Sequence, residues 1–295
     1  MSKLYNVNGK LLPADQATVN VEDRGFMYGD GAFETLRAYG GSVFRWGAHA
    51  ERLRQSCDAL EIDHGLDSAT LRERIDETLA ANEFQEAYVK LSITRGRQPG
   101  KLDPAPNSDP TVVVYVSPLA EGGTGGESVW DGPARLQTVS TQRIPDEALP
   151  AQAKTHNYLN EILARLELRE TDADEALMLD LDGNIAEGAT CNIFFVDDDG
   201  LRTPRLDGSI LPGITRETVL AIAEEERIPV EQSQYEPARL READEVFLTN
   251  STWEVRPVAS VDGKTIGNGG PGPMTRLLSH LFDQRIDERH YRDSD

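Results

Sequence analysis

Hydrophobic residues recur along the first third of the chain with two different spacings, which predict helices and strands. Leu53, Cys57 and Leu60 follow one another at steps of three or four residues, the spacing of one helix face. The segments 87–94 and 111–116 are rich in β-branched residues and predict strands. A second predicted helix face consists of Leu71, Ile75 and Leu79. This part of the chain therefore predicts a small α+β unit.

The remaining part of the chain also predicts helices and strands, with no internal repeat. Asp262 and Gly263, just before Lys264, are a hairpin-turn signal. The predicted helices cover 157–169, 215–226 and 272–284, and the predicted strands lie near 175–180, 192–196, 245–249 and 254–261.

A glycine-rich segment from Glu121 to Glu127 separates the two parts, because it supports neither periodicity. At 295 residues the chain is longer than the roughly 100–150 residues typical of a domain with a single core. We therefore predict a small α+β domain over 1–120, a Gly-rich linker over 121–132 and a larger C-terminal domain over 133–295.

The composition indicates a globular protein. The hydrophobic share is 38% and the charged share is 27%, which is typical of a chain that folds around a core. No apolar run approaches the roughly 18 residues that a membrane span needs. The N-terminus lacks the basic start and apolar run of a secretory signal. We expect a cytoplasmic protein with no membrane partner.

The net charge of −21 is spread along the chain, so it is a property of the whole surface. Nucleic acid is not an expected partner, because its phosphates would be repelled. Only six of the 30 basic residues are lysines, and this acidic, lysine-poor composition resembles that of proteins from salt-accumulating halophiles. Cys57 and Cys191 lack metal-binding spacing, so we expect two core thiols and no metal site.

Few of the lysines are placed for covalent chemistry, because a lysine that forms a Schiff base must be shielded and held in position. Lys90 lies in a predicted strand, and Lys154 follows small and apolar residues that lead into the predicted helix 157–169. The other four lysines lie near the N-terminus or in turns. A lysine before a helix is commonly a plain surface residue, so from this pattern alone both interpretations of Lys154 stay open.

Three further segments could hold a polar ligand, and each also has an ordinary structural explanation. Glu187 is bracketed by small and apolar residues, so it needs a partner, either a ligand nitrogen or an arginine. Segment 211–216 opens a predicted helix whose N–H groups would attract an anion, although it is also a common helix start. Segment 249–254 is a hydroxyl-rich turn that would donate to a phosphate or cap the turn.

The order and spacing of these features, together with two motifs near the N-terminus, resemble one enzyme family. The matching segments are Asp23-Arg-Gly-Phe-Met-Tyr-Gly-Asp-Gly-Ala-Phe-Glu34, His49-Ala-Glu-Arg-Leu53, Lys154-Thr-His-Asn-Tyr158, Glu187-Gly188, Leu211 to Arg216 and Glu254-Val-Arg-Pro-Val258. From about residue 4 to 284 the chain resembles the class IV, fold-type IV, pyridoxal-phosphate aminotransferases. These include branched-chain aminotransferases, D-amino-acid aminotransferases and aminodeoxychorismate lyases. The resemblance implies a two-domain fold that combines α+β and α/β parts, similar to that of D-amino-acid aminotransferases, with a cofactor-binding C-terminal domain.

The resemblance also implies a role for each residue around pyridoxal 5'-phosphate. Lys154 would hold the cofactor as a Schiff base and then shuttle a proton. Glu187 would pair with the pyridine nitrogen, Leu211 would pack against the ring, and Tyr158 would lie near the phenolic oxygen. The phosphate would be bound by one arginine, two backbone N–H groups and one hydroxyl, namely those of Arg52, Ile214, Thr215 and Ser251 or Thr252.

The positions that would contact the substrate match more than one branch of the family. Arg37 is shared by the branched-chain enzymes and the lyases, whereas Thr35 matches the lyases. Lys90 stands where the branched-chain enzymes carry an arginine for acidic substrates. Segment 254–258 resembles the aminotransferases. The full set of candidate substrate residues is Tyr28, Phe33, Thr35, Arg37, Tyr88, Lys90 and Trp253.

Three functions follow from this resemblance. The first is a transaminase that moves an amino group between an amino acid and a 2-oxo acid. The alternative is a lyase that releases pyruvate from 4-amino-4-deoxychorismate to give 4-aminobenzoate, and a remote third is a non-catalytic family member. The resemblance further implies a homodimer in which the loop Gly96 to Pro106 enters the neighbouring subunit's active site. The stereochemistry of the substrate stays open.

Overall fold

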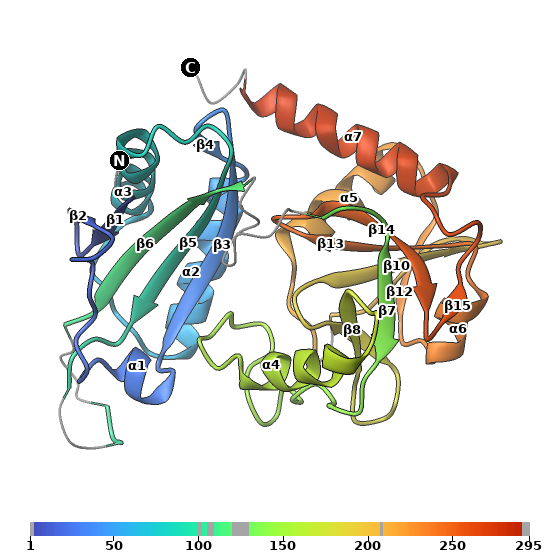
Figure 1. Cartoon of the computed structure of the whole chain (residues 1–295), viewed down its shortest axis with the longest axis horizontal. Coiled ribbons are helices and arrows are strands. Elements are labelled where there is room, and N and C mark those ends of the chain that lie inside the picture. Colours follow the sequence, from blue (N-terminus) through green and yellow to red (C-terminus); the bar gives the residue numbers. More distant parts are fainter. Residues whose placement is uncertain (1–2, 99–101, 105–108, 120–129, 207–208, 291–295) are drawn as a thin grey trace. The chain divides into compact units, whose positions relative to one another are not determined.

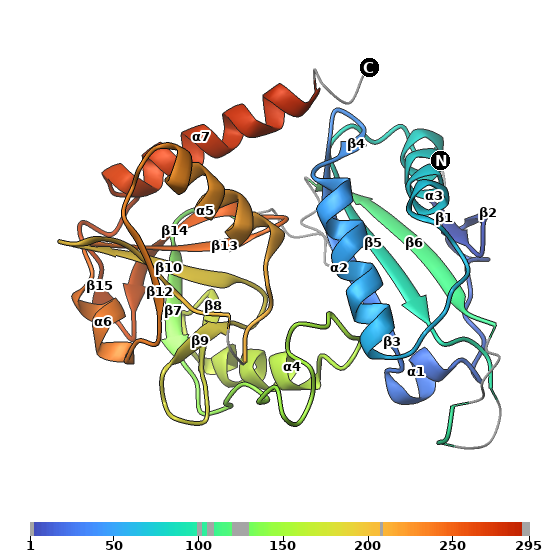
Figure 2. The same ribbon diagram turned by 180° about the vertical axis from the view of Figure 1, so that it is seen from behind.

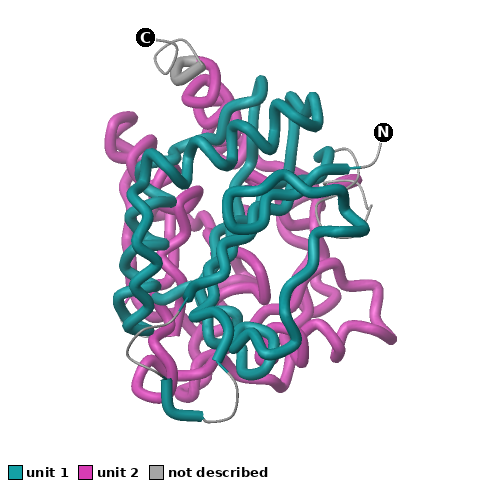
Figure 3. The backbone as a smooth tube through the Cα atoms, turned by 90° about the vertical axis from the view of Figure 1, so that its left-hand side faces the viewer, with its two compact units in different colours: residues 1–129, 153–157, 294 teal, residues 130–152, 158–293, 295 magenta. Residues whose placement is uncertain are grey.

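The computed structural model describes residues 3–98, 102–104, 109–119, 130–206 and 209–290 (Figure 1). The chain forms two compact units, one built from residues 1–129 with 153–157 and the other from 130–152 with 158–293 (Figure 3). Most of the predicted linker, 121–129, lies outside the described residues, as do 99–101 and 105–106 of the predicted partner loop. We call the two parts unit 1 and unit 2 and describe each by itself.

Unit 1 contains a six-stranded antiparallel sheet in the order β2-β1-β6-β5-β3-β4. Its strands are β1 (Leu4–Val7), β2 (Lys10–Pro13), β3 (Gly31–Tyr39), β4 (Ser42–Val43), β5 (Ala87–Thr94) and β6 (Thr111–Pro118). Its helices are α1 (Arg24–Tyr28), α2 (Trp46–Ala59) and α3 (Ser68–Ala81). The last two and strands β5 and β6 confirm the elements expected from the hydrophobic spacing.

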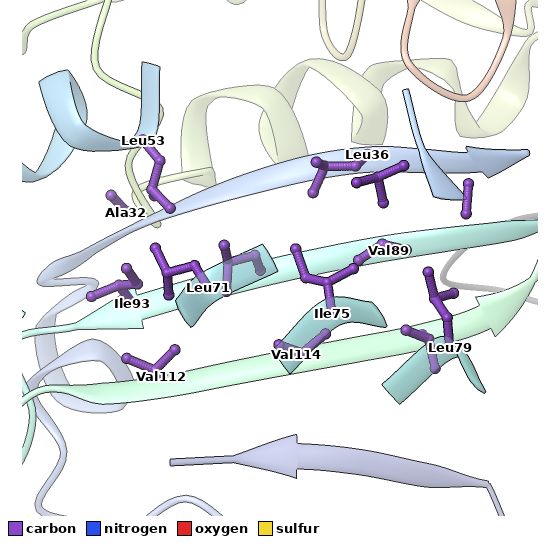
Figure 4. Packing of buried hydrophobic residues seen from close by; sticks show 14 of the residues in the cluster. Ala32, Leu36, Leu53, Leu71, Ile75, Leu79, Val89, Ile93, Val112 and Val114 are labelled. Atoms are coloured by element: carbon purple, nitrogen blue, oxygen red, sulfur yellow. The ribbon is translucent and has the colours of Figure 1, made fainter. Parts of the chain in front are cut away.

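The helices α2 and α3 cover one face of this sheet, and α2 lies in front of its strands when the molecule is seen from behind in Figure 2. The helix faces predicted from the sequence supply the contacts: Leu53 and Cys57 are buried on α2, and α3 is buried along one side. Burying these side chains removes apolar surface from water, which is the main stabilising term of this unit. Figure 4 shows Leu71, Ile75 and Leu79 of α3 against Val89, Ile93, Val112 and Val114 of the sheet.

Unit 2 contains a nine-stranded sheet in the order β12-β11-β10-β13-β14-β7-β8-β9, with β15 paired to β14. Its strands are β7 (Ala134–Thr138), β8 (Glu175–Leu179), β9 (Ile185–Gly188), β10 (Asn192–Asp197), β11 (Gly200–Pro204), β12 (Val230–Ser233), β13 (Glu245–Asn250), β14 (Glu254–Val261) and β15 (Lys264–Thr265). Its helices are α4 (Leu159–Leu166), a 3₁₀ turn (Glu167–Glu170), α5 (Ile214–Glu225), α6 (Pro237–Glu242) and α7 (Pro273–His290).

The predicted hairpin turn and both predicted core thiols are present. Asp262 and Gly263 both have positive φ, and they connect β14 to β15 through the pair Val261 and Lys264. The two cysteines are buried and free. Burial raises the pKa of the Cys57 thiol to about 12 and raises that of Cys191 well above its usual value, so both are poor nucleophiles at neutral pH.

None of the described helices is long and apolar enough to cross a membrane. Within the described residues, no group of three or more His, Cys, Asp or Glu side chains is arranged to hold a metal ion.

Candidate active site

Lys154 is attached to the sheet of unit 1 by its main chain. The carbonyl of Lys154 accepts a hydrogen bond from the N–H of Phe33 at 2.9 Å, and His156 N–H donates to the Gly31 carbonyl at 2.9 Å. The Ser56 hydroxyl of α2 accepts from Lys154 N–H at 2.9 Å. We expected Lys154 at the start of a rigid helix, but α4 begins only at Leu159. Pairing with β3 holds the lysine instead.

The side-chain amines of Lys154 and of a second lysine lie against the same aromatic ring. The Nζ atom of Lys154 lies 4.7 Å from the centre of the Phe33 ring, and that of Lys90 lies 4.3 Å from it. Burial, and then the charge of Lys154, lower the pKa of Lys90. Burial, and then the charge of Lys90, lower the pKa of His156 to about 4, so this imidazole is neutral at physiological pH. The Phe33 ring therefore lies close to the amines of Lys90 and Lys154 and to the imidazole of His156.

Strands β3 and β5 bring most of the candidate substrate residues to one face of the unit 1 sheet. Thr35 lies opposite Lys90 and Arg37 opposite Tyr88, and directly opposite residues project from the same face. Phe33 lies two positions before Thr35 and shares that face. Helices α2 and α3 pack on the other face. Two aromatic rings, two cations and a hydroxyl are thus displayed together.

Two candidate substrate residues do not belong to this face. Tyr28 ends α1, where its ring lies 5.1 Å from the Arg24 guanidinium and is partly exposed. Trp253 lies in unit 2, with its ring 5.0 Å from the Arg256 guanidinium.

Arg52 takes part in a buried charge cluster on the helix-covered side of β3. Its Nε and Nη2 atoms donate to Glu34 at 2.8 and 2.6 Å, and His49 Nδ1 lies 2.7 Å from the same carboxylate. Burial raises the pKa of the Glu34 carboxyl group, but Arg52 and His49 outweigh burial and lower that pKa to about 2. Two of the five N–H groups of the guanidinium are used in this pair.

Glu187 is held at the centre of a polar cluster in unit 2. Its Oε1 atom lies 2.9 Å from Arg143 Nη2, and its Oε2 atom accepts from Asn192 Nδ2 at 3.1 Å and from Leu211 N–H at 3.2 Å. Arg143 also pairs with Glu161. These carboxylates, with Tyr158, raise the pKa of Arg143 although burial lowers it. The buried carboxylate is therefore compensated by a guanidinium and two neutral donors.

The N-terminus of α5 lies beside the same cluster. Asn192 Nδ2 also donates to the Leu211 carbonyl at 2.9 Å, and a Cβ atom at Gly213 would approach Asn192 Oδ1 to 2.0 Å, so a larger residue there would displace the Asn192 amide. Gly213 caps the helix without a side-chain hydrogen bond, and Ile214 and Thr215 form its first turn. Such a helix start directs N–H groups and a positive dipole end towards an anion.

A turn between β13 and β14 carries the candidate hydroxyls Ser251 and Thr252. The Asn250 side chain closes it, because its Oδ1 accepts from the N–H groups of Thr252 at 3.0 Å and Trp253 at 2.7 Å. Next to it, Thr249 is opposite Asn192, and within the described part of the chain its buried hydroxyl has no hydrogen-bond partner. The turn therefore adds hydroxyls near the Asn192 cluster.

The candidate residues fall into two groups, one in each unit. Unit 1 carries Lys154, Arg52 and the β3–β5 face, and unit 2 carries Glu187, Tyr158, Leu211, the α5 start and the hydroxyl turn. Sequence reasoning assigned no role to the residues that hold these groups in place. Glu34 and His49 lie inside the two motifs near the N-terminus, whereas no sequence pattern marks Arg143 in the irregular segment 139–153. The residues without an assigned role are Glu34, His49, Arg143, Asn192 and His156.

Sequence comparisons identify known proteins that this chain resembles. The family model for amino-transferase class IV matches residues 31–261. A putative branched-chain-amino-acid aminotransferase of Methanocaldococcus jannaschii is 39% identical over 280 residues, which cover 95% of each protein. A D-alanine aminotransferase of Bacillus licheniformis is 32% identical over 282 residues, again 95% of each protein.

Solved structures with the same fold include both kinds of enzyme considered above. The branched-chain aminotransferase of Thermoproteus uzoniensis, solved with norvaline, superposes with a TM-score of 0.88 at 31% identity, covering 96% of this chain and 94% of that chain. The 4-amino-4-deoxychorismate lyase of Pseudomonas aeruginosa superposes with a TM-score of 0.82 at 31% identity, covering 96% of this chain and 100% of that chain.

Proposed function

Because the chain belongs to the class IV aminotransferase family, we propose that Lys154 is its catalytic lysine. The family makes the protein a transaminase that uses pyridoxal 5'-phosphate and moves an amino group between an amino acid and a 2-oxo acid. The observation that carries the assignment of Lys154 is its position. Its amine lies against Phe33, on a segment fixed by two backbone hydrogen bonds to β3 and by one from the Lys154 N–H to the Ser56 hydroxyl. A lysine so placed is held in position, as nucleophilic catalysis requires.

Each unit carries groups of the kinds that this cofactor needs. When bound, pyridoxal phosphate supplies an aldehyde for a lysine amine and an electron-withdrawing ring that stabilises negative charge at the substrate α-carbon. Glu187 is a buried carboxylate suited to a protonated ring nitrogen, and Arg143 and Asn192 orient it. Two features of unit 2 suit a phosphate: Gly213 caps α5 without a side-chain hydrogen bond, and the buried Thr249 hydroxyl has no hydrogen-bond partner among the described residues.

The remaining cofactor contacts are assigned to the residues that the family pattern indicates. Leu211 would pack against the ring and Tyr158 would lie near its phenolic oxygen. Phosphate binding is assigned to Arg52, Ile214, Thr215 and Ser251 or Thr252. For Arg52 this assignment rests on the family pattern, and Glu34 and His49 would act by holding the guanidinium.

Two steps of transamination are assigned to Lys154. Its amine would hold the cofactor until a substrate amine takes its place, and it would then accept the proton from the substrate α-carbon and return it to the cofactor carbon that carried the aldehyde. A base that moves a proton between two nearby atoms must stay within reach of both, and the main-chain pairing to β3 limits its movement. His156 is neutral, so it adds no further charge beside this amine.

For the substrate we propose an amino acid bound over the β3–β5 face of unit 1. Phe33 and Tyr88 provide an apolar wall, while Arg37 and Lys90 offer cations to carboxylates. The lyase remains the second candidate, because Thr35 lies beside Lys90 on that face and the lyase of Pseudomonas aeruginosa shares the fold. Tyr28 and Trp253 are assigned to the substrate from the family pattern.

We also propose a cytoplasmic homodimer adapted to high salt. The support is the net charge of −21 with six lysines among 30 basic residues, and the family pattern in which the loop Gly96 to Pro106 enters the neighbouring site. An acidic surface binds water and cations strongly and keeps a protein soluble where salt screens other charges.

The test uses purified protein reconstituted with pyridoxal phosphate. We expect several amino acids from a panel of L- and D-isomers to change the visible absorbance of the bound cofactor and to yield their 2-oxo acids. Lys154→Ala is the control that keeps the fold but lacks the amine. If no amino acid changes the absorbance while aminodeoxychorismate yields pyruvate, the lyase takes the place of the transaminase.

A further inference from the structure

Arg216 is more deeply buried than any other arginine that the structure describes, with 2% of its surface exposed. It lies in the first turn of α5, and its Nη2 atom donates to the Pro204 carbonyl of β11 at 2.9 Å and to Gln232 Oε1 of β12 at 2.8 Å. Both acceptors are neutral. Its Nε atom is buried and has no hydrogen-bond partner among the described residues. The guanidinium is therefore anchored by groups that do not balance its charge.

The other buried arginines of the described residues each have a carboxylate oxygen within 4.0 Å, because a buried charge is costly unless it is paired. Arg216 differs from them, since no carboxylate of a described residue lies within that distance of its guanidinium. Its positive charge is thus left without an ion pair in the deepest position of all. The arginines that do have a carboxylate partner are Arg24, Arg52, Arg95, Arg143, Arg202 and Arg256.

The surroundings of Arg216 leave it charged. Burial lowers the pKa of its guanidinium to about 10, although the charge of Glu187 opposes this shift. A group with a pKa of about 10 still carries its proton at neutral pH. Glu187 is itself paired with Arg143 at 2.9 Å, so it balances Arg216 only in part. Positive charge therefore remains beside the start of α5.

The side chain of Arg216 leaves α5 close to the N-terminal end of that helix. A Cβ atom at the cap residue Gly213 would lie 3.4 Å from Arg216 Cβ. In a helix the Cα–Cβ bonds tilt towards the N-terminus, where free N–H groups and the helix dipole also favour an anion. The unbalanced charge and the anion-binding N–H groups thus belong to the same helical turn.

From this arrangement we propose that Arg216 provides the positive charge that balances the cofactor phosphate. The inference rests on the proposed function, which assigns the phosphate to the N–H groups of Ile214 and Thr215. The action is electrostatic, since Nη2 is already held by β11 and β12. Arg216 is therefore a positioning residue for the phosphate and adds to its assigned ligands.

The charges of the other groups show why such a residue is needed. A phosphate ester carries about −1.5 to −2 charges at pH 7, and a chain with a net charge of −21 gives it no long-range attraction. Arg52, assigned as a direct ligand, adds little net charge because Glu34 already pairs with it. Arg216 is the buried guanidinium whose charge no described carboxylate has neutralised.

The experiment compares two ligands of the protein from which the cofactor has been removed. Pyridoxal 5'-phosphate and pyridoxal share the ring and the aldehyde, so the ratio of their dissociation constants isolates the phosphate. Arg216→Gln should raise the dissociation constant of pyridoxal phosphate at least about 10-fold and that of pyridoxal less than about 3-fold. Arg216→Lys keeps the charge, so its ratio should stay within about 3-fold of the wild-type ratio.

Arg202→Gln is the matched control. Arg202 is also a buried arginine of unit 2, but Asp197 and Glu231 already balance its charge. Its replacement should change the affinities for both ligands by the same factor. Far-UV circular dichroism checks that each variant is folded. Arg216→Met, which also removes the charge, takes the place of Arg216→Gln if that variant does not fold, with the same expected ratio.

A purely structural role for Arg216, as a tie between α5 and the strands β11 and β12, predicts different results. The inference is overturned if the uncharged variant weakens both ligands equally, or if Arg216→Lys loses as much preference for the phosphate as the uncharged variant does. These affinities do not depend on turnover. A protein that shows the expected ratios but converts no amino acid would refute the proposed function and leave the inference standing, so the two failures are distinguishable.

Discussion

Phe33 and Lys154 contact one another through both main chain and side chain: the Phe33 N–H donates to the Lys154 carbonyl at 2.9 Å, and the Lys154 amine lies 4.7 Å from the Phe33 ring centre. The position of the lysine is therefore set by its backbone. Removing the amine should leave the pairing with β3 intact.

Lys154→Ala should abolish transamination while the protein keeps its fold. The main-chain hydrogen bonds to Phe33 and Ser56 do not need the side chain, whereas covalent attachment of the cofactor does. Turnover, visible absorbance and melting temperature measured together check this. Borohydride reduction and peptide mapping of the wild type should label Lys154. A label on Lys90 would overturn the assignment.

Glu187→Gln should retain the cofactor but lower turnover by on the order of 10² or more, because a neutral amide does not keep the ring nitrogen protonated. The fold should survive, since Arg143 still pairs with Glu161. Cofactor content is read from absorbance and turnover from 2-oxo acid formation. Unchanged turnover would rule out the pairing between Glu187 and the ring.

Glu34→Gln should destabilise the protein by about 3–5 kcal/mol at neutral pH, because it leaves the Arg52 guanidinium buried without its carboxylate. The pKa of Glu34 is lowered to about 2 from an ordinary value of 4.5. Its ionised form therefore stabilises the fold fully above about pH 4.5, and this contribution is lost as the pH falls through about 2.

The check is the difference in unfolding free energy between wild type and Glu34→Gln, measured by denaturant titration at several pH values. This difference should shrink as the pH is lowered from 5 towards 2. Glu51→Gln serves as control, because its carboxylate pairs with Arg54 on the exposed side of α2. A difference independent of pH would contradict the role assigned to Glu34.

Gly213→Ala should distort the start of α5 and weaken cofactor binding. The new methyl group would meet Asn192 Oδ1, whose amide also holds Glu187 and Leu211, so overpacking there should cost about 1–3 kcal/mol. Gly47→Ala is the control, since a Cβ there meets nothing within 4 Å. Equal cofactor affinity in both variants would show that the close approach is unimportant.

Stability should rise with salt. The net charge of −21 makes the folded protein repel itself at low ionic strength, and about 1 M salt shortens the screening length to roughly 3 Å. Melting temperatures recorded between 0.1 M and molar KCl should therefore increase steadily. A flat profile would remove the support for adaptation to high salt.

Local patterns predicted the elements whose signals lie within one segment. The steps of four in 71–79 gave α3, and β-branched runs gave β5 and β6. The Asp262-Gly263 pair gave the last hairpin because positive φ is available to both residues. The final helix, expected over 272–284, begins at Pro273 and continues to His290.

Sequence patterns did not predict which distant segments of the chain pair with one another. β7 lies between β14 and β8 and runs parallel to both. No residue pattern in 134–138 predicts either of these pairings. Arg143 lies outside any helix or strand, so nothing in the sequence connected it with Glu187. The segment around Lys154 does lead into α4, as the sequence predicts, but its main-chain pairing with β3 joins residues too far apart in the sequence for a local pattern to predict.

The pairing of segment 153–157 with β3 has a consequence for synthesis. Strands β3, β5 and β6 are synthesised before Lys154. The edge of β3 from Gly31 to Phe33 is therefore at first without segment 153–157, which pairs with it in the folded protein. An open strand edge is a template for pairing with other chains. The pairing of residues 153–157 with β3 covers that edge and places the Lys154 amine beside Phe33, so one contact both removes an open strand edge and positions the lysine.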